Sequence, residues 1–364
     1  MSSNFFSSLL SPSRENLLSI DIGSNSIKVM ELKSTPSGKM ELMSAGQVPT
    51  PANVIKNNVI TKPEAIGNAI KSLVESNAIN TNQVVTAVPG PSVFTKRITT
   101  AAVSLKELHN NITYEAGNYI PHTIDAVHLD YQVLGSNGKS SMDVLLVAVK
   151  NEIIRSFLES IEHAGLETVV VDVDYFALEN MFALNYPEEC KKTLALINIG
   201  ARYSTVNILQ DGVSLFTGDV TVGGRLYTDA LCESLALEPL VAEQAKMGRF
   251  PETVDKNIVT ETLDRTTEHI AAELHRQIGF FWSAAATDRQ IEAVYLAGGG
   301  AQVSGLVDEL NSRTGMQVHI VDSFRAIDAT DRFDTEYLNE IAPAMSVSVG
   351  LALRTIGDKE HAIP

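Results

Sequence analysis

The sequence predicts an α/β protein of two related lobes, with a smaller α+β module inserted into the first lobe. A strand–turn–strand motif at residues 17–32 (LLSIDIGSNSIKVMEL) is repeated at residues 194–209 (LALINIGARYSTVNIL). A repeat separated by about half the chain indicates two related lobes with a site between them. An apolar strand within residues 291–301 (IEAVYLAGGGA) ends in three glycines, and residues 92–166 have a β-α-β-β-α order bounded by chain breakers.

The composition is that of a globular protein with a sizeable core. The 364 residues suffice for about two to three folding units, and 44% of them are hydrophobic. A formal net charge of −16 argues against non-specific binding to nucleic acid or to an anionic membrane. Two cysteines without CxxC spacing give neither a disulfide framework nor a zinc signature. No run of about 18 apolar residues occurs, so we expect no direct insertion into a membrane.

The first strand–turn–strand motif has the residue types of a phosphate-binding turn. Its glycine lets the backbone approach a ligand, and the amides and hydroxyls beside it can donate to phosphate oxygens. Asp21, at the end of the first strand, could hold Mg²⁺ directly or through water, and Lys28 could face the phosphates. Taken alone, this motif favours an ordinary surface hairpin, so the two further glycine motifs carry the argument.

The elements that follow are predicted from spacing and breakers. Residues 39–48 are a second strand, residues 63–76 have helical spacing, and residues 83–88 are a strand that ends at Pro89-Gly90-Pro91. The inserted module contains strands at 93–99, 126–134 and 144–149 and helices at 105–119 and 152–163. A strand at 169–173 leads into a helix at 175–184. The following apolar strand begins the second lobe.

The second and third glycine motifs predict the opposite wall of the same site. The repeat changes Asp-Ile-Gly to Asn-Ile-Gly at Asn198 and continues to Thr205. Two such turns facing one another could clamp a polyphosphate from both sides. After residues 291–297, Gly298, Gly299 and Gly300 permit close backbone approach, and the helix that follows offers free amides to an anionic or purine ligand.

Five segments of the chain resemble, in order, the motifs of the actin/Hsp70/sugar-kinase ATPase fold. The two phosphate turns are residues 21–28 and 198–205, the two connecting helices are residues 171–178 and 344–354, and the adenosine motif is residues 296–301. Further segments, among them NYIPHTIDAVHLDYQVLG and HAGLETVVVDVDYFAL, are similar to the family of type IV pilus assembly proteins PilM, which is related to FtsA. The resemblance covers roughly residues 17–356 and implies an actin-like (ribonuclease H-like) fold.

The resemblance also implies a division into lobes and subdomains. Residues 1–16 would be a flexible tail. The first lobe (1A) would comprise residues 17–91, 167–190 and 341–364, with the inserted subdomain 1C at 92–166. The second lobe (2A) would comprise residues 191–226 and 287–340, with a helical subdomain (2B) at 227–286.

By resemblance, ATP or ADP with Mg²⁺ would bind between the lobes. The residues implied for the nucleotide, with Asp21 also near the metal, are Asp21, Gly23, Ser24, Asn25, Ser26, Lys28, Asn198, Gly200, Ala201, Thr205, Gly223, Gly224, Glu243, Lys246, Gly298, Gly299, Gly300 and Gly350. The second phosphate turn of this superfamily usually carries Asp where this chain has Asn198, and Mg²⁺ favours carboxylates. We therefore expect slow or absent hydrolysis, with Asp174 best placed by its motif to position a water.

The implied partner is the cytoplasmic N-terminal tail of the bitopic inner-membrane protein PilN, bound in the groove between 1A and 1C. The protein would then be cytoplasmic and peripheral at the inner membrane through PilN. Other pilus assembly proteins, including the assembly motor ATPase, are expected partners, and weak self-association is left open. The alternatives are an FtsA-like filament-forming ATPase, the equivalent type II secretion component, and a small-molecule kinase on the same fold.

Overall fold

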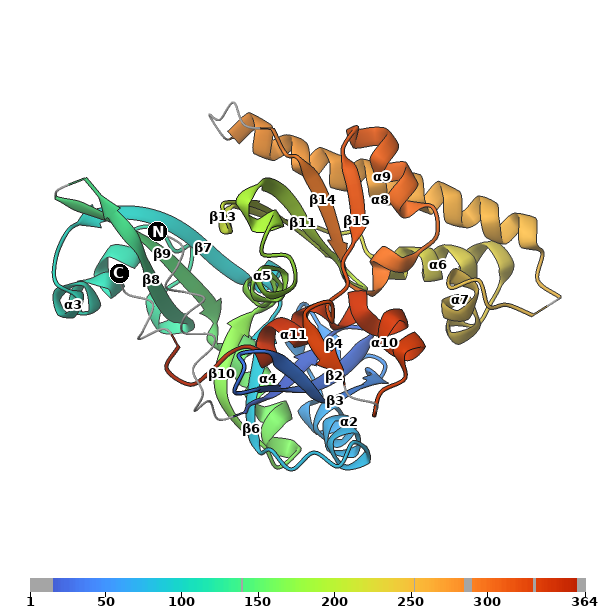
Figure 1. Ribbon diagram of the computed structural model, residues 1–364, viewed down its shortest axis with the longest axis horizontal. Helices are drawn as coiled ribbons and strands as arrows, with labels where there is room; N and C mark the ends of the chain where they lie inside the picture. The colour runs from blue at the N-terminus through green and yellow to red at the C-terminus, as the bar shows by residue number, and fades with distance from the viewer. Residues whose placement is uncertain (1–15, 139, 252, 285–289, 330–331, 359–364) are drawn as a thin grey trace.

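The computed structural model describes residues 16–138, 140–251, 253–284, 290–329 and 332–358. Its two largest sheets are separated by helices α5 (Asp174–Asn185) and α11 (Ser346–Ala352), at the centre of Figure 1. The predicted flexible tail lies, apart from Asn16, outside the described residues. Within those residues, no helix has the length and apolar character needed to cross a membrane.

The first lobe is a six-stranded sheet in the order β10-β6-β1-β2-β3-β16. Its strands are β1 (Leu18–Ile22), β2 (Ser26–Ser34), β3 (Met40–Pro49), β6 (Gln83–Val88), β10 (Glu167–Val173) and β16 (Ile327–Ala329). Because β6 runs parallel to β1 and β10 parallel to β6, each connection must cross over, and helices α2 (Pro63–Ser76) and α4 (Asn151–His163) lie in these crossovers. Alternate residues of β6 face opposite sides: Val84 packs in the cluster with α2 and α4, and Val85 in the cluster with α5 and α11.

The second lobe is a five-stranded sheet in the order β13-β12-β11-β14-β15. Its strands are β11 (Thr193–Ile199), β12 (Ser204–Gln210), β13 (Val213–Val220), β14 (Ala293–Ala297) and β15 (Gln317–Ile320). Helices α8 (Lys256–Ala284) and α9 (Leu306–Thr314) pack on one face of this sheet. The other face meets α5, where Leu196 of β11 joins Met181 in a core cluster shared with the first lobe. Helices α6 (Gly224–Leu235) and α7 (Pro239–Lys246) form a separate small cluster with the first part of α8.

The inserted module has a three-stranded sheet in the order β7-β9-β8, at the left of Figure 1. It comprises β7 (Val93–Ala101), α3 (Leu105–Ala116), β8 (Val127–Asn137) and β9 (Ser141–Lys150), and its own core includes Ile98, Leu108 and Leu146. Helix α4, which the sequence assigned to this module, packs instead in the core of the first lobe through Phe157 and Ile161. Along the chain, β9 is therefore the last element that contributes to the module's own core.

One strand differs from the predicted division of the chain. β16 lies within residues 287–340, which were expected in the second lobe, yet it pairs in parallel with β3 of the first lobe. The reason is apolar packing, because Ile327 shares a buried cluster with Met40 and Leu42. The chain then continues through α10 (Thr335–Ile341) to α11. The other predicted boundaries stay predictions.

Candidate functional site

The two strand–turn–strand motifs fold into the same backbone turn. The amide of Gly23 donates to the carbonyl oxygen of Ser26 at 3.1 Å, and the amide of Gly200 donates to that of Tyr203 at 3.1 Å. A methyl group on either glycine would lie 2.9 Å from the same carbonyl oxygen, closer than side-chain carbons normally approach. The repeat in the sequence is thus a repeat in the structure, and each turn needs its glycine.

Asp21 and Lys28 face each other across β1 and β2, and their charged groups are 2.8 Å apart. Only 16% and 12% of the two side chains are exposed, so salt screens this pair weakly. Lys28 thereby offsets the charge of the carboxylate predicted to lie near Mg²⁺. Among the described residues, no cluster of three or more His, Cys, Asp or Glu side chains could hold a metal. A Mg²⁺ ion here would therefore take most of its ligands from water and phosphate, as this ion commonly does.

The second turn is held against the start of helix α6. The amide of Gly224 donates to the carbonyl oxygen of Gly200, and the amide of Arg225 to that of Ala201, both at 2.8 Å. A methyl group on Gly223 would lie 2.6 Å from the carbonyl oxygen of Gly200, so the approach requires glycine. The structure thus brings together four of the predicted residues.

The three consecutive glycines have different surroundings. Gly298 has a φ of +85°, and a methyl group there would lie 2.4 Å from the carbonyl oxygen of Ile199. A methyl group on Gly300 would lie 2.5 Å from Cγ2 of the same residue. Gly299 is exposed, and its nearest neighbour would be Cβ of Ala344 at 3.9 Å. Gly298 and Gly300 therefore permit close packing behind the second turn, whereas Gly299 leaves its backbone open.

Asn198, at the start of the second motif, lies against the third motif. It pairs with Thr205 of β12 and Ala297 of β14, and its Oδ1 would lie 2.5 Å from a methyl group on Gly298. The hydroxyl of Thr205 donates to a carboxylate oxygen of Asp219 at 3.0 Å. The hydroxyl hydrogen of Thr205 is therefore used within the protein and is not free to donate to a phosphate.

Glu243 and Lys246 form an ion pair of 2.7 Å on one face of α7. The Lys246 side chain is only 9% exposed, and its Nζ also donates to the carbonyl oxygen of Gly224 at 3.4 Å. Thr228 of α6 donates to the other oxygen of Glu243. The pair therefore lies beside the start of α6, and its predicted contact with the sugar and base of a nucleotide stays a prediction.

Asp174, at the first position of α5, joins the two lobes. Its Oδ1 accepts from the amide of Gly90 at 3.0 Å, and its Oδ2 accepts from the hydroxyl of Tyr203 at 3.1 Å. The pKa of this carboxyl is raised from 3.8 to about 7, chiefly by burial and also by the charges of Asp219 and Asp21, while the two hydrogen bonds act to lower it. One bond reaches each oxygen, so the protein fixes the orientation of this carboxyl, while each oxygen keeps a further lone pair.

Gly350 is a correction to the predicted binding residues. It is buried in α11, where a methyl group would lie 1.6 Å from the carbonyl oxygen of Ala177 in α5. Its role is to let the two central helices touch, and its backbone is covered by α5. Sequence reasoning also missed Tyr203 and Gly90. A signal for Tyr203 existed, because it occupies the position of Ser26 in the repeat.

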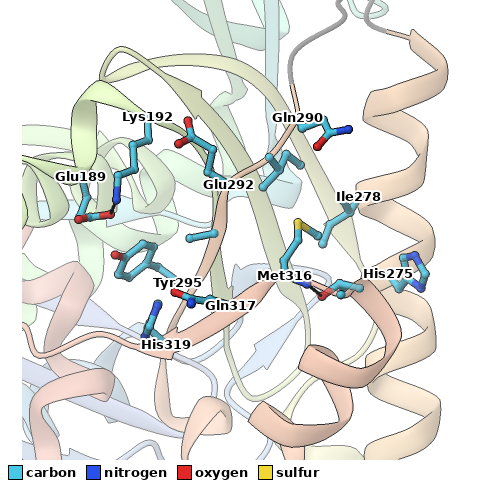
Figure 2. Close-up of a pocket in the computed structure, with 14 residues that line it drawn as sticks. Glu189, Lys192, His275, Ile278, Gln290, Glu292, Tyr295, Met316, Gln317 and His319 are labelled. Carbon is cyan, nitrogen blue, oxygen red and sulfur yellow. Dashed lines mark hydrogen bonds and ion pairs between the residues drawn. The ribbon is translucent and has the colours of Figure 1, made fainter.

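Two hollows lie apart from the glycine turns. The larger, of about 1060 Å³, is at the end of β14 and β15 remote from Gly298. Figure 2 shows Glu189 facing Lys192, with their charged groups 2.8 Å apart, and Tyr295 beside His319, with ring centres 5.2 Å apart. Their arrangement points to no particular ligand.

The second hollow, of about 650 Å³, lies between the first lobe and the inserted module. One side is the hairpin of β4 (Ile55–Lys56) and β5 (Val59–Ile60), and the other is η1 (Gly90–Ser92), the start of β7 and the end of β9. We call this hollow the module groove. It is lined by Lys56, Asn57, Asn58, Val59, Thr61, Pro91, Ser92, Val93, Phe94, His122, Ala148, Lys150, Glu152 and Ile153.

Comparison with known proteins identifies the fold and the family. The chain is similar to a solved protein described as the PilM-PilN type IV pilus biogenesis complex, with 27% identity, a TM-score of 0.83, and coverage of 97% of this chain and 100% of the other. It is also similar to the ethanolamine utilization protein EutJ from Carboxydothermus hydrogenoformans, with 15% identity, a TM-score of 0.56, and coverage of 95% and 93%. The predicted actin-like ATPase fold is thereby confirmed. Since the family model described as type IV pilus assembly protein PilM matches residues 19–356, the chain belongs to this family.

Proposed function

We propose that this chain is an ATP-binding scaffold of type IV pilus assembly that binds the cytoplasmic N-terminal tail of PilN in the module groove. The protein would be cytoplasmic and would reach the inner membrane through PilN. The observation that carries the proposal is the module groove itself, which lies between 1A and 1C in a chain similar over 97% of its length to one solved in a PilM-PilN complex.

The chemistry of the module groove suits a short peptide. Its apolar side chains include Val59 and Phe94, which can cover the apolar side chains of an extended segment. Lys56 and Lys150 are exposed at its walls, against the single carboxylate of Glu152. This local positive charge contrasts with the formal net charge of −16 of the whole chain and favours a tail with acidic or carbonyl oxygens facing the lysines.

The glycine turns support the nucleotide part of the proposal. Ser24, Asn25 and Ser26 of the first turn are at least partly exposed, and the second turn is held against the start of α6. Glu243 and Lys246 would contact the sugar and base, and Gly299 offers open backbone beside them. Asp21 would hold Mg²⁺ through water and phosphate oxygens, and the metal would neutralise phosphate charge.

Two features support slow or absent hydrolysis. Asp174 has both oxygens bound by Gly90 and Tyr203, and Asn198 supplies no negative charge beside the second turn. A general base must lie within hydrogen-bond reach of the water it activates, and the bonds from Gly90 and Tyr203 hold this carboxyl in one orientation. We therefore expect nucleotide to act as a structural ligand, and a turnover of about 1 s⁻¹ or faster would contradict this.

The test is calorimetric titration of the protein with a peptide of the PilN N-terminal tail, with and without ATP·Mg²⁺. Lys150→Glu reverses a charge at the module groove and should weaken peptide binding tenfold or more, which corresponds to about 1.4 kcal/mol. Lys71→Glu, on the exposed face of α2, is the matched control and should bind as the wild type. Binding of ATP without any binding of the peptide would leave the fold intact and remove PilN as partner.

A further inference from the structure

Two contacts join the second phosphate turn to the walls of the module groove. The hydroxyl of Tyr203 donates to Asp174, whose other oxygen accepts from the amide of Gly90. Gly90 begins η1, the segment that continues into the groove wall at Pro91 and Ser92. The link from the phosphate turn to the groove therefore consists of two side chains, Tyr203 and Asp174, and two hydrogen bonds.

The neighbouring residue makes the second contact. Arg202 donates through Nη1 to the carbonyl oxygen of Ile55 at 3.5 Å, a long hydrogen bond. Ile55 is in β4, next to Lys56 of the opposite groove wall. Two successive residues of one turn thus reach both walls of the groove, one wall each.

Both contacts cross from the second lobe to the first. Tyr203 and Arg202 follow β11, whereas Asp174 and Ile55 belong to the first lobe. A rotation that separated the lobes would break both contacts together. Each groove wall would then lose one attachment, and the amide of Gly90 would lose the support that Tyr203 gives to its acceptor.

We propose that Asp174 and Tyr203 are positioning residues through which nucleotide between the lobes tightens the binding of a peptide in the module groove. The inference rests on the proposed function for the identity of both ligands. A nucleotide that touches both phosphate turns binds the closed arrangement better than the open one, and this difference is what a ligand needs to shift an equilibrium. The closed arrangement fixes both groove walls, so the peptide binds a preformed site and loses less entropy on binding.

The variants separate this route from general damage. Tyr203→Phe removes only the hydroxyl that bonds Asp174, and Arg202→Ala removes the contact to Ile55. Tyr227→Phe is the matched control, because it removes a buried tyrosine hydroxyl, bonded to Thr267, from the same lobe. Peptide affinity is measured by calorimetry with and without a non-hydrolysable ATP analogue and Mg²⁺.

In the wild type and in Tyr227→Phe, we expect the analogue to tighten peptide binding about fivefold or more, within the usual range of allosteric coupling. In the Tyr203→Phe/Arg202→Ala double variant, the effect should fall below about twofold, and the reciprocal effect of the peptide on nucleotide affinity should fall equally. Retained coupling in the double variant would overturn the route. Absence of coupling in a wild type that binds both ligands would overturn the inference and leave the proposed function standing.

Hydrogen exchange gives a readout that needs no peptide. The analogue should slow exchange in the segment 90–94, where the Gly90 amide bonds Asp174, in the wild type and in Tyr227→Phe but not in Tyr203→Phe. Equal slowing in all three proteins would overturn the role of Tyr203. If the analogue slows this exchange but the PilN peptide does not bind, the coupling stands and the proposed partner fails.

Discussion

Gly298 and Gly299 are adjacent in the sequence, yet alanine should have very different effects at the two positions. At Gly298 the backbone has a φ of +85° and a ψ of 159°, a conformation that is essentially restricted to glycine and costs other residues about 1–3 kcal/mol. The added methyl group would also lie 2.4 Å from the carbonyl oxygen of Ile199, and forcing extra carbon into a packed region costs about 1–3 kcal/mol. Together these terms predict a loss of about 2–6 kcal/mol for Gly298→Ala.

Gly299→Ala is the matched control. Its methyl group would have Cβ of Ala344 at 3.9 Å as its nearest neighbour, an ordinary contact, and its φ is not positive. Surface substitutions of this kind change stability by about 0.5 kcal/mol or less. The measurement is urea unfolding of both variants and the wild type, followed by far-UV circular dichroism without nucleotide.

Nucleotide binding provides the second arm of this test. Ile199 ends β11 directly before the second turn, so strain at Gly298 should displace that turn and weaken binding of ATP. Gly299→Ala should bind ATP with affinity closer to the wild type, since its backbone is not displaced. If the two variants unfold at the same urea concentration, the packing of Gly298 against Ile199 is wrong. If Gly298→Ala is unstable but binds ATP normally, the third motif does not support the second turn.

Three further outcomes are expected. Gly350→Ala should be strongly destabilising in thermal unfolding, because its methyl group would lie 1.6 Å from the Ala177 carbonyl oxygen. Gly279→Ala is the control. The added carbon there would have none of the neighbours within 4 Å that Gly350 has, and it should stabilise α8 by about 0.5–1 kcal/mol. The folded-state pKa of Asp174 is raised to about 7, so the unfolded chain loses this proton at a lower pH than the folded protein does. As the pH rises from about 4 to 7, the wild type should therefore lose up to about 4 kcal/mol of stability relative to Asp174→Asn. Parallel pH profiles of the urea midpoint for the two proteins would contradict this. Lys246→Met should weaken binding of a fluorescent ATP analogue, and unchanged affinity would remove this residue from the site.

The local features of the site were predictable because they depend on backbone geometry that the sequence encodes. The Asp-Ile-Gly and Asn-Ile-Gly repeats predicted two turns, and both form the same hydrogen bond from glycine to the third residue after it. Gly350 was wrongly assigned because glycine serves equally for ligand approach and for helix packing. Only the contact with Ala177 distinguishes the two uses.

Contacts between distant segments were not predictable. β16 joins the sheet of the first lobe through three residues, too few to show a periodic pattern. The bonds of Asp174 to Gly90 and Tyr203 join positions 84 and 29 residues apart, and the bond to Tyr203 also depends on how the two lobes are placed. The residue pattern within a single strand or helix does not indicate how distant segments are placed relative to one another.

Two buried carboxyls on α5 have raised pKa values, and this suits contacts between the lobes that must break and form again. Besides Asp174, this helix carries Glu179, which accepts from Asn207 of β12, and burial raises the pKa of Glu179 to about 8. Near neutral pH both carboxyls can therefore be protonated, so their contacts with the second lobe need not bury a charge. A neutral hydrogen bond stabilises by about 0.5–1.5 kcal/mol, whereas breaking a buried ion pair costs about 3–5 kcal/mol. Contacts of the weaker kind fall within the 1–3 kcal/mol that allosteric coupling typically supplies. A ligand between the lobes can therefore control them, which a pair of buried charges would resist.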